Sequence, residues 1–140
     1  MGPDELVVGA GPTGLLLACE LRRRGVAALV VDPKAGPTRE SRAMFVQARS
    51  LEIYDGPGIG AQAVRQGDLD FGTPGEDRTP HPFILAPEQS RNEVLLDRTL
   101  RALGGGVEWG WALEGLCQDA PGVTATLSGP GGERREVRVG

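Results

Sequence analysis

The chain has 140 residues, 39 % of them hydrophobic, and a formal net charge of −4. This length suits one compact domain, and an acidic chain with scattered basic residues lacks the positive field that nucleic-acid binding requires. Cys19 and Cys117 do not have the spacing of a disulfide framework or a zinc site, and the early apolar run at residues 6–8 is too short for a signal sequence or a membrane span. We therefore expect a cytoplasmic protein without a nucleic-acid, membrane or metal partner.

Residues 1–32 have the pattern of a βαβ unit. Residues 5–10 form a Val-rich run that ends in a glycine-rich turn, which is typical of a buried parallel strand. Residues 12–24 carry apolar side chains at helical spacing, and residues 27–32 form a second apolar strand that ends at an acid. We expect the two strands to be parallel and the crossover between them to be right-handed, as is usual for such units.

The middle of the chain alternates between loops and short elements. Gly and Pro residues mark the boundaries, and apolar side chains at helical spacing mark the helices. The elements expected are a polar loop at 33–42, helices at 46–54 and 59–66, a loop at 67–82, a strand at 82–86 and an amphipathic helix at 88–103.

The last third alternates in the manner of β-strands. Strands are expected at 107–111, 113–118, 123–127 and 133–139. Residues 128–132 are a Gly- and Pro-containing turn that joins the last two strands as a hairpin. The pattern predicts a C-terminal antiparallel β-meander after the βαβ unit.

Gly9, Gly11 and Gly14 have the spacing G-x-G-x-x-G between the first strand and the first helix. Gly9 permits a tight turn, Gly11 lets backbone N–H groups approach a pyrophosphate, and Gly14 lets the helix pack close to the strand. The helix N-terminus adds a positive partial charge, and Asp32 ends the second strand where a carboxylate can accept hydrogen bonds from a ribose. The glycines alone could form an ordinary turn, but with the strands, helix and acid they predict a Rossmann-like unit that binds an adenine dinucleotide.

Three further segments extend this pattern beyond the glycine-rich segment VVGAGPTGLLLACELRRRGV. They are GPTRESRAMFVQARSLEIYD, PFILAPEQSRNEVLLDRTLRALG and LEGLCQDAPGVTATLSGPGG. In this order the four segments resemble those of the group A flavoprotein monooxygenases with the para-hydroxybenzoate hydroxylase fold, especially the hydroxylases that tailor aromatic polyketides and related antibiotics. The resemblance implies an α/β fold with a Rossmann-like FAD-binding βαβ unit and parallel sheet, followed by the antiparallel β-meander.

The resemblance also implies that FAD is the cofactor and which residues bind it. They are Gly9 in the cofactor-binding turn, Gly11, Pro12, Thr13 and Gly14 at the pyrophosphate, Asp32 at the ribose, Arg42 at the pyrophosphate from the opposite side, Gln89 and Arg91 at the ribityl chain, and the Leu113 backbone at the adenine. A guanidinium fork suits the phosphate role of Arg42. Without the resemblance, Arg42 would be interpreted as a solvated loop residue and Gln89 as an ordinary residue at a helix start.

In the family, NADPH reduces the flavin and oxygen from O2 is transferred to an electron-rich aromatic substrate. The cofactor supplies that chemistry, so we expect no catalytic acid, base, nucleophile or metal ligand among these residues. The resemblance therefore implies that the intact enzyme hydroxylates a small aromatic, polyketide-like substrate.

Family members are several hundred residues long, so residues 1–140 correspond to a partial FAD-binding domain. Residues 1–32 are its βαβ fingerprint, residues 82–140 its ribityl-side helix and β-meander, and the substrate domain is absent. In the family's sheet, the first strand lies between the second strand and strands from the absent part, so here its open edge invites self-association. We expect these residues alone to bind FAD weakly and to hydroxylate nothing.

Two alternative functions are open, and the first belongs to a different functional class. The first is a non-catalytic nucleotide-binding module, such as a degenerate truncated paralogue, which sequence beyond Gly140 would distinguish from a monooxygenase. The second is an NAD-dependent dehydrogenase, which needs another βα unit soon after Asp32, where the loop that contains Arg42 follows instead.

Overall fold

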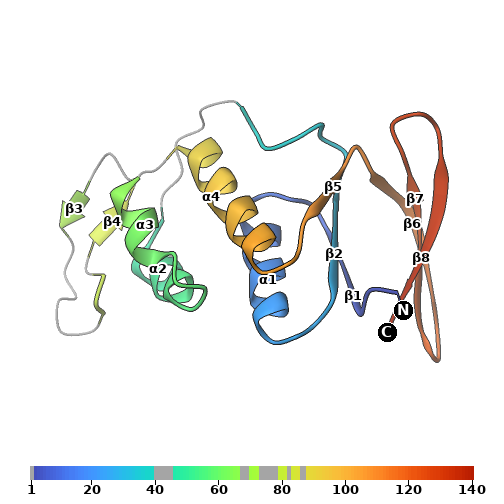
Figure 1. Cartoon of the computed structure of the whole chain (residues 1–140), viewed down its shortest axis with the longest axis horizontal. Helices are drawn as coiled ribbons and strands as arrows, with labels where there is room; N and C mark the ends of the chain where they lie inside the picture. Colours follow the sequence, from blue (N-terminus) through green and yellow to red (C-terminus); the bar gives the residue numbers. More distant parts are fainter. Residues whose placement is uncertain (1, 40–45, 67–69, 73–78, 82, 86–87) are drawn as a thin grey trace.

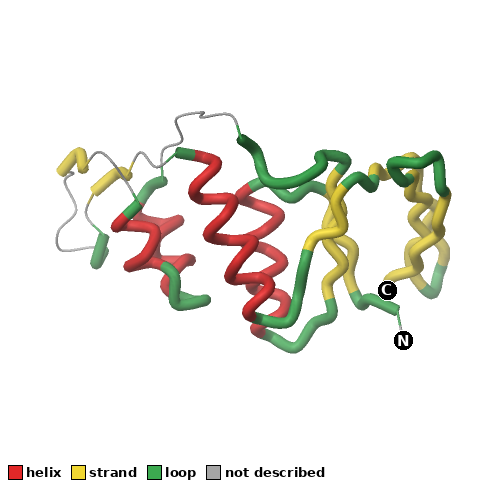
Figure 2. The backbone as a smooth tube through the Cα atoms, turned by 45° about the horizontal axis from the view of Figure 1, so that its top comes forward, coloured by secondary structure: helices red, strands yellow, loops and turns green. Residues whose placement is uncertain are grey.

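A computed structural model of the chain describes residues 2–39, 46–66, 70–72, 79–81, 83–85 and 88–140. A helical layer, a parallel sheet and an antiparallel sheet follow one another along the long axis of the molecule (Figure 1). Figure 2 shows the same succession of layers from another direction. The parallel sheet therefore has one face against helices and the other against the antiparallel sheet.

The parallel sheet has the strand order β1-β2-β5, so its central strand is β2. Its strands are β1 (Glu5–Val8), β2 (Ala28–Asp32) and β5 (Val107–Trp109). Helix α1 (Pro12–Arg23) connects β1 to its parallel neighbour β2, which confirms the predicted βαβ unit. Val30 and Val31 are fully buried because β2 has layers on both faces, which explains the continuous apolar run in its sequence.

The helical layer consists of two packed pairs of helices. Helix α1 packs against α4 (Gln89–Ala102), and α2 (Ala48–Asp55) packs against α3 (Gly60–Arg65). The Cys19 thiol donates to the carbonyl of Leu96 at 3.6 Å between α1 and α4, and burial raises the pKa of Cys19 to about 11. The Asn92 amide on α4 donates to the Tyr54 hydroxyl on α2 at 2.9 Å. These contacts join both helix pairs into one layer with a common core.

The antiparallel sheet is the predicted C-terminal β-meander. It has the order β6-β7-β8, with β6 at Ala112–Asp119, β7 at Gly122–Ser128 and β8 at Arg134–Val139. Its buried side chains Ala125, Leu127 and Val137 pack with Val31 of the parallel sheet. The hairpin between β7 and β8 is confirmed, and the meander covers the face of the parallel sheet that the helices leave open.

A short hairpin corrects one prediction. The strand β3 (Asp70–Gly72) pairs antiparallel with β4 (Phe83–Leu85). The strand predicted at 82–86 is confirmed, but the loop predicted at 67–82 is wrong for the residues of β3. A strand of three residues is too short to show alternation in its sequence, and it forms here by pairing with a partner across the intervening segment.

Candidate dinucleotide-binding site

The turn between β1 and α1 depends on glycine at two positions. Gly9 has φ of 105°, a backbone conformation that glycine adopts without a steric penalty. A Cβ on Gly14 would lie 1.9 Å from the carbonyl oxygen of Gly9, so only glycine lets the first turn of α1 rest on the preceding loop. Gly9 also donates its N–H to Val31 at 2.8 Å, which fixes the turn to β2.

The N-terminus of α1 has free space beside it in the described part of the chain. Gly11 is the residue before Pro12, the first residue of the helix, and a Cβ on Gly11 would meet no atom of the described residues within 4 Å. Leu15 donates its N–H to the carbonyl of Gly11 at 2.9 Å, so the N–H groups of Thr13 and Gly14 precede this helical hydrogen bond. Backbone donors at an accessible helix N-terminus, aided by the helix dipole, favour a phosphate group.

Asp32 connects this turn to the end of β2. Its side chain is buried, Oδ2 accepts the Ala10 N–H at 2.7 Å, and Oδ1 accepts the Lys34 N–H at 2.8 Å. Each carboxylate oxygen can accept more than one hydrogen bond. Asp32 therefore both holds the glycine-rich turn and offers acceptor capacity for hydroxyl groups at the carboxyl end of the strand.

A buried acid that the sequence analysis missed lies on α4. Glu93 is fully buried, and its Oε2 accepts the Thr38 N–H at 2.8 Å, while its Oε1 accepts an N–H of the Gln89 amide at 2.8 Å. Burial raises the pKa of Glu93, but the hydrogen bonds from Thr38 and Gln89, together with the Lys34 ammonium 3.5 Å away, hold its pKa below the usual value. The signal in the sequence was an acid at position 93, seven residues before the buried Leu100 and so on the same helix face.

Residues after Asp32 and the start of α4 together line a cavity of about 820 Å³. Its lining residues are Lys34, Ala35, Gly36, Pro37, Thr38, Arg39 and Gln89. This volume lies within the range of roughly 300–1,000 Å³ that is usual for ligand pockets. The predicted ribityl-side residue Gln89 thus lines a cavity with the loop that follows the predicted ribose acid.

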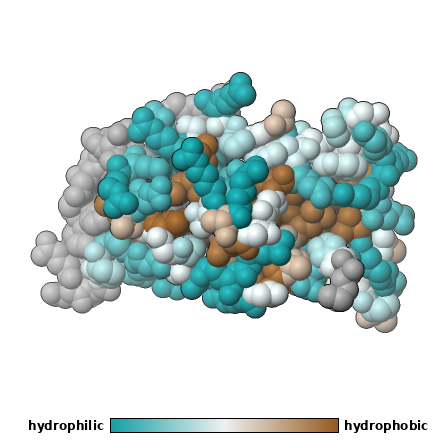
Figure 3. All heavy atoms as spheres, in the orientation of Figure 1, coloured by the Kyte–Doolittle hydropathy of each residue, from teal (hydrophilic) through white to brown (hydrophobic). Residues whose placement is uncertain are grey.

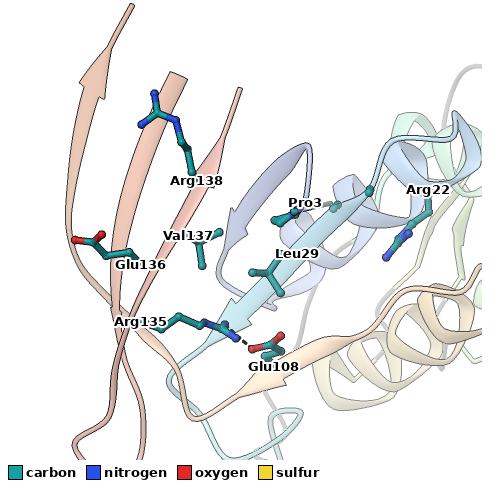
Figure 4. A pocket seen from close by; sticks show the side chains of 11 residues that line it. Pro3, Arg22, Leu29, Glu108, Arg135, Glu136, Val137 and Arg138 are labelled. Atoms are coloured by element: carbon teal, nitrogen blue, oxygen red, sulfur yellow. Dashed lines mark hydrogen bonds and ion pairs between the residues drawn. The ribbon is translucent and has the colours of Figure 1, made fainter. Parts of the chain in front are cut away.

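A second cavity of about 660 Å³ lies between the amino end of β2 and strand β8 (Figure 4). It contains none of the predicted site residues. Two of its arginines already have acidic partners, because Arg135 pairs with Glu108 and Arg138 pairs with Asp119 at 2.7 Å. The glycine-rich turn, where the dinucleotide is predicted to bind, lies at the opposite end of the parallel strands.

The remaining predicted residues are not all brought to this site. Arg91 is about half exposed and pairs with Glu88 at 3.3 Å, and neither residue lines the cavity beside Gln89. Leu113 lies in β6 and packs against the cluster around Val31, near the end of β2. Arg42 lies outside the described residues.

Among the described residues, no helix has the length and apolar character needed to cross a membrane. Within the same part of the chain, no group of three or more His, Cys, Asp or Glu side chains is arranged to hold a metal ion.

The fold is that of a dinucleotide-binding domain, with a glycine-rich turn joined to the buried acid Asp32 and a cavity beside α4. The FAD binding domain family matches residues 4–139. The chain therefore belongs to this family, and the prediction of FAD as its cofactor is confirmed.

Individual relatives agree with this assignment. The chain is 40 % identical over 142 residues to 12-dehydrotetracycline 5-monooxygenase/anhydrotetracycline 6-monooxygenase of Streptomyces rimosus, covering 92 % of this chain and 28 % of that protein. It is 39 % identical over 135 residues to rifampicin monooxygenase of Streptomyces venezuelae, covering 89 % of this chain and 28 % of that protein. The chain thus spans less than a third of the length of these relatives.

Solved structures also match nearly the whole of this chain, which again covers only part of each of them. The anhydrotetracycline hydroxylase of Streptomyces rimosus superposes with a TM-score of 0.88 at 37 % identity, covering 99 % of this chain and 30 % of that chain. The ternary complex of aklavinone-11 hydroxylase with FAD and aklavinone superposes with a TM-score of 0.84 at 29 % identity, covering 98 % of this chain and 31 % of that chain. The predicted α/β fold, incomplete relative to the family, is confirmed.

Proposed function

We propose that this chain is the N-terminal, cofactor-binding part of a monooxygenase that uses FAD, NADPH and O2 to hydroxylate an aromatic, polyketide-like substrate. The observation that carries the proposal is the hydrogen bond from Ala10 to Asp32, which joins the glycine-rich turn to a buried acid at the edge of an open helix N-terminus. The relatives named for tetracycline precursors and rifampicin support the substrate class.

In this proposal each part of the site binds one part of FAD. The backbone N–H groups of Thr13 and Gly14 donate to the pyrophosphate, and Gly11 leaves room for its approach. Asp32 accepts hydrogen bonds from the ribose hydroxyls and repels a 2′-phosphate. Gln89 contacts the ribityl chain from the far wall of the cavity.

The remaining assignments rest on the family resemblance. They are pyrophosphate for Arg42, ribityl chain for Arg91 and adenine for the Leu113 backbone. When bound, FAD supplies the hydride and oxygen chemistry, and the chain's own residues orient the cofactor and limit its exposure to water. We also propose a cytoplasmic location, because Cys19 and Cys117 are both free thiols, as is usual in a reducing compartment.

Competitive binding tests the proposed cofactor. Calorimetric titration of the purified chain with FAD, FMN and NAD is expected to show FAD binding at least about tenfold more tightly than either competitor, because FMN lacks the ADP half and NAD lacks the ribityl chain. The affinity for FAD is expected to be weak, and NADPH with O2 is expected to yield no hydroxylated product from this chain alone. A preference for NAD would contradict the flavin assignment, and stoichiometric FAD with product formation would contradict the expected inactivity.

We further propose that the outer edge of β1 pairs with another copy of this chain. Within the described part of the chain, β1 has a neighbouring strand only on the β2 side, and Val8 is 50 % exposed. Figure 3 shows apolar surface where the parallel sheet meets the antiparallel sheet. An edge strand with unpaired backbone groups favours association with a second strand.

Sedimentation velocity measures this association directly. The purified chain is expected to show a dimer that increases with protein concentration, and Val8→Lys is expected to sediment as a monomer because edge lysines oppose strand pairing. Leu116→Lys is the matched control, since Leu116 is also exposed but lies on β6. A wild-type chain that stays monomeric at all concentrations would refute the proposal.

A further inference from the structure

Glu93 is a fully buried carboxylate whose contacts come from both walls of the cavity beside α4. Oε1 accepts from Gln89 on α4, and Oε2 accepts from Thr38 in the loop after β2. Lys34 of the same loop places its ammonium 3.5 Å from Oε2. A buried charge is tolerated when it is paired and hydrogen-bonded, and here the partners are residues that line the cavity.

The bond to Oε1 determines which way the Gln89 amide is turned. A carboxylate accepts hydrogen bonds and cannot donate them, so it must face the NH2 group of Gln89. The Gln89 oxygen is therefore left as the acceptor for a different group. An acceptor on this wall suits a ligand that presents hydroxyl donors, as a polyol chain does.

The bonds to Oε2 hold the opposite wall. The loop begins at Asp32, which accepts the Lys34 N–H, and it is held again by the bond from Thr38 to Glu93. The Lys34 ammonium also donates to the Thr38 hydroxyl at 3.1 Å. Two buried acids therefore anchor the loop, one at the end of β2 and one on α4.

We propose that Glu93 is a positioning residue for the cofactor, which sets the orientation of the Gln89 amide and the position of residues 34–39. This inference rests on the proposed function, because it takes FAD as the ligand of the cavity. Glu93 itself acts through Gln89 and the loop, and it fixes the positions of both walls before the cofactor binds.

An isosteric change and its reversal test the orientation of Gln89. The amide introduced by Glu93→Gln has one acceptor oxygen, and Thr38 and Lys34 donate to it. Its NH2 group therefore faces Gln89. The Gln89 amide must then reverse its orientation, so that its oxygen accepts from this NH2 group. The Gln89 amide then presents N–H donors to the cavity in place of its acceptor oxygen, and the affinity for FAD is expected to fall about tenfold. In the double variant Gln89→Glu with Glu93→Gln, the carboxylate now at position 89 accepts from the amide at position 93 and keeps an acceptor toward the cavity. Its affinity is expected to return to within about threefold of wild type.

The matched control is Asp97→Asn, because Asp97 is a buried acid one turn further along α4 that pairs with Arg101 at 2.9 Å. Calorimetry is expected to give this variant the wild-type affinity within about twofold. The proposal is overturned if Glu93→Gln binds FAD like wild type, if the double variant is as weak as the single one, or if Asp97→Asn weakens binding equally.

A measurement without cofactor separates this proposal from the proposed function. Glu93→Leu replaces the carboxylate with an apolar side chain of similar size and removes both acceptors, so the core stays filled. Amide hydrogen exchange at Thr38 is expected to become about tenfold faster or more, while exchange at Leu96 is unchanged. Unchanged exchange at Thr38 would overturn the role of Glu93. A wild-type chain that fails to bind FAD would instead contradict the proposed function, and the exchange at Thr38 would still decide whether Glu93 holds the loop.

Discussion

Replacing Gly14 with alanine is expected to lower the free energy of unfolding by about 3 kcal/mol or more. The new Cβ would lie 1.9 Å from the Gly9 carbonyl oxygen and 3.1 Å from its carbon, which are backbone atoms in the turn that fixes β1 to α1. Relief requires α1 to move away from the sheet, and this would open the buried contacts of Leu15 and Cys19. Urea denaturation followed by circular dichroism measures the loss, which corresponds to a drop in melting temperature of roughly 10 °C.

Gly11→Ala is the matched control, because it adds the same methyl group three residues earlier. Gly11 has φ of −77°, and its Cβ would meet no atom within 4 Å in the part of the chain that the structure describes, so the stability is expected to change by about 1 kcal/mol or less. The methyl group would instead occupy space that the proposed pyrophosphate needs, and FAD affinity is expected to fall. Equal stability of the two variants would show that the close packing at Gly14 has no energetic importance.

Replacing Asp32 with alanine is expected to reduce both stability and cofactor affinity. Ala10 is fully buried, and its N–H would lose the acceptor that now lies 2.7 Å away, at a cost of about 1–3 kcal/mol. The proposed ribose hydroxyls would lose a charged acceptor, so FAD affinity is expected to fall about a hundredfold or more. Urea denaturation and calorimetric titration with FAD measure the two effects separately.

Asp32→Asn is not expected to recover the stability and FAD affinity that Asp32→Ala loses. Both oxygens of Asp32 face backbone N–H donors, from Ala10 and Lys34, so an amide group would place its own N–H against one of them. Asp119→Asn serves as the control, because Asp119 is about half exposed and pairs with Arg138 far from the turn. If Asp32→Ala binds FAD like the Asp119 variant, Asp32 does not contact the ribose.

The cofactor turn could be predicted from the sequence because its determinants are local. Gly9 and Gly14 are required by a positive φ and a backbone contact within a few residues, and both requirements leave glycine as the residue that fits. Asp32 was found because an acid at the end of an apolar strand is a short-range signal. Four segments in family order then indicated FAD, which the family match confirms.

Glu93 could not be assigned from local pattern, because two of its partners, Thr38 and Lys34, come from a loop more than fifty residues earlier in the chain, with Thr38 separated by 55 positions. An acid in an amphipathic helix is expected on the solvent side, and only a loop that supplies N–H and ammonium donors makes its burial favourable. The same argument applies to β3, which forms through its pairing with β4.

The sequence by itself determined the βαβ unit, the glycine-rich turn, the acid at the end of β2 and the β-meander, because periodicity and turn chemistry act over short distances. Only the tertiary structure decided that β5 joins the parallel sheet beside β2, while the next strand, β6, belongs to the meander. The strands β5 and β6 have similar sequence patterns. Which of them joins the parallel sheet depends on which face and which edge of that sheet remain uncovered after α1 and α4 have packed. The cavity between residues 34–39 and Gln89 was likewise decided by that packing, because it brings a loop and a helix start together around one buried carboxylate.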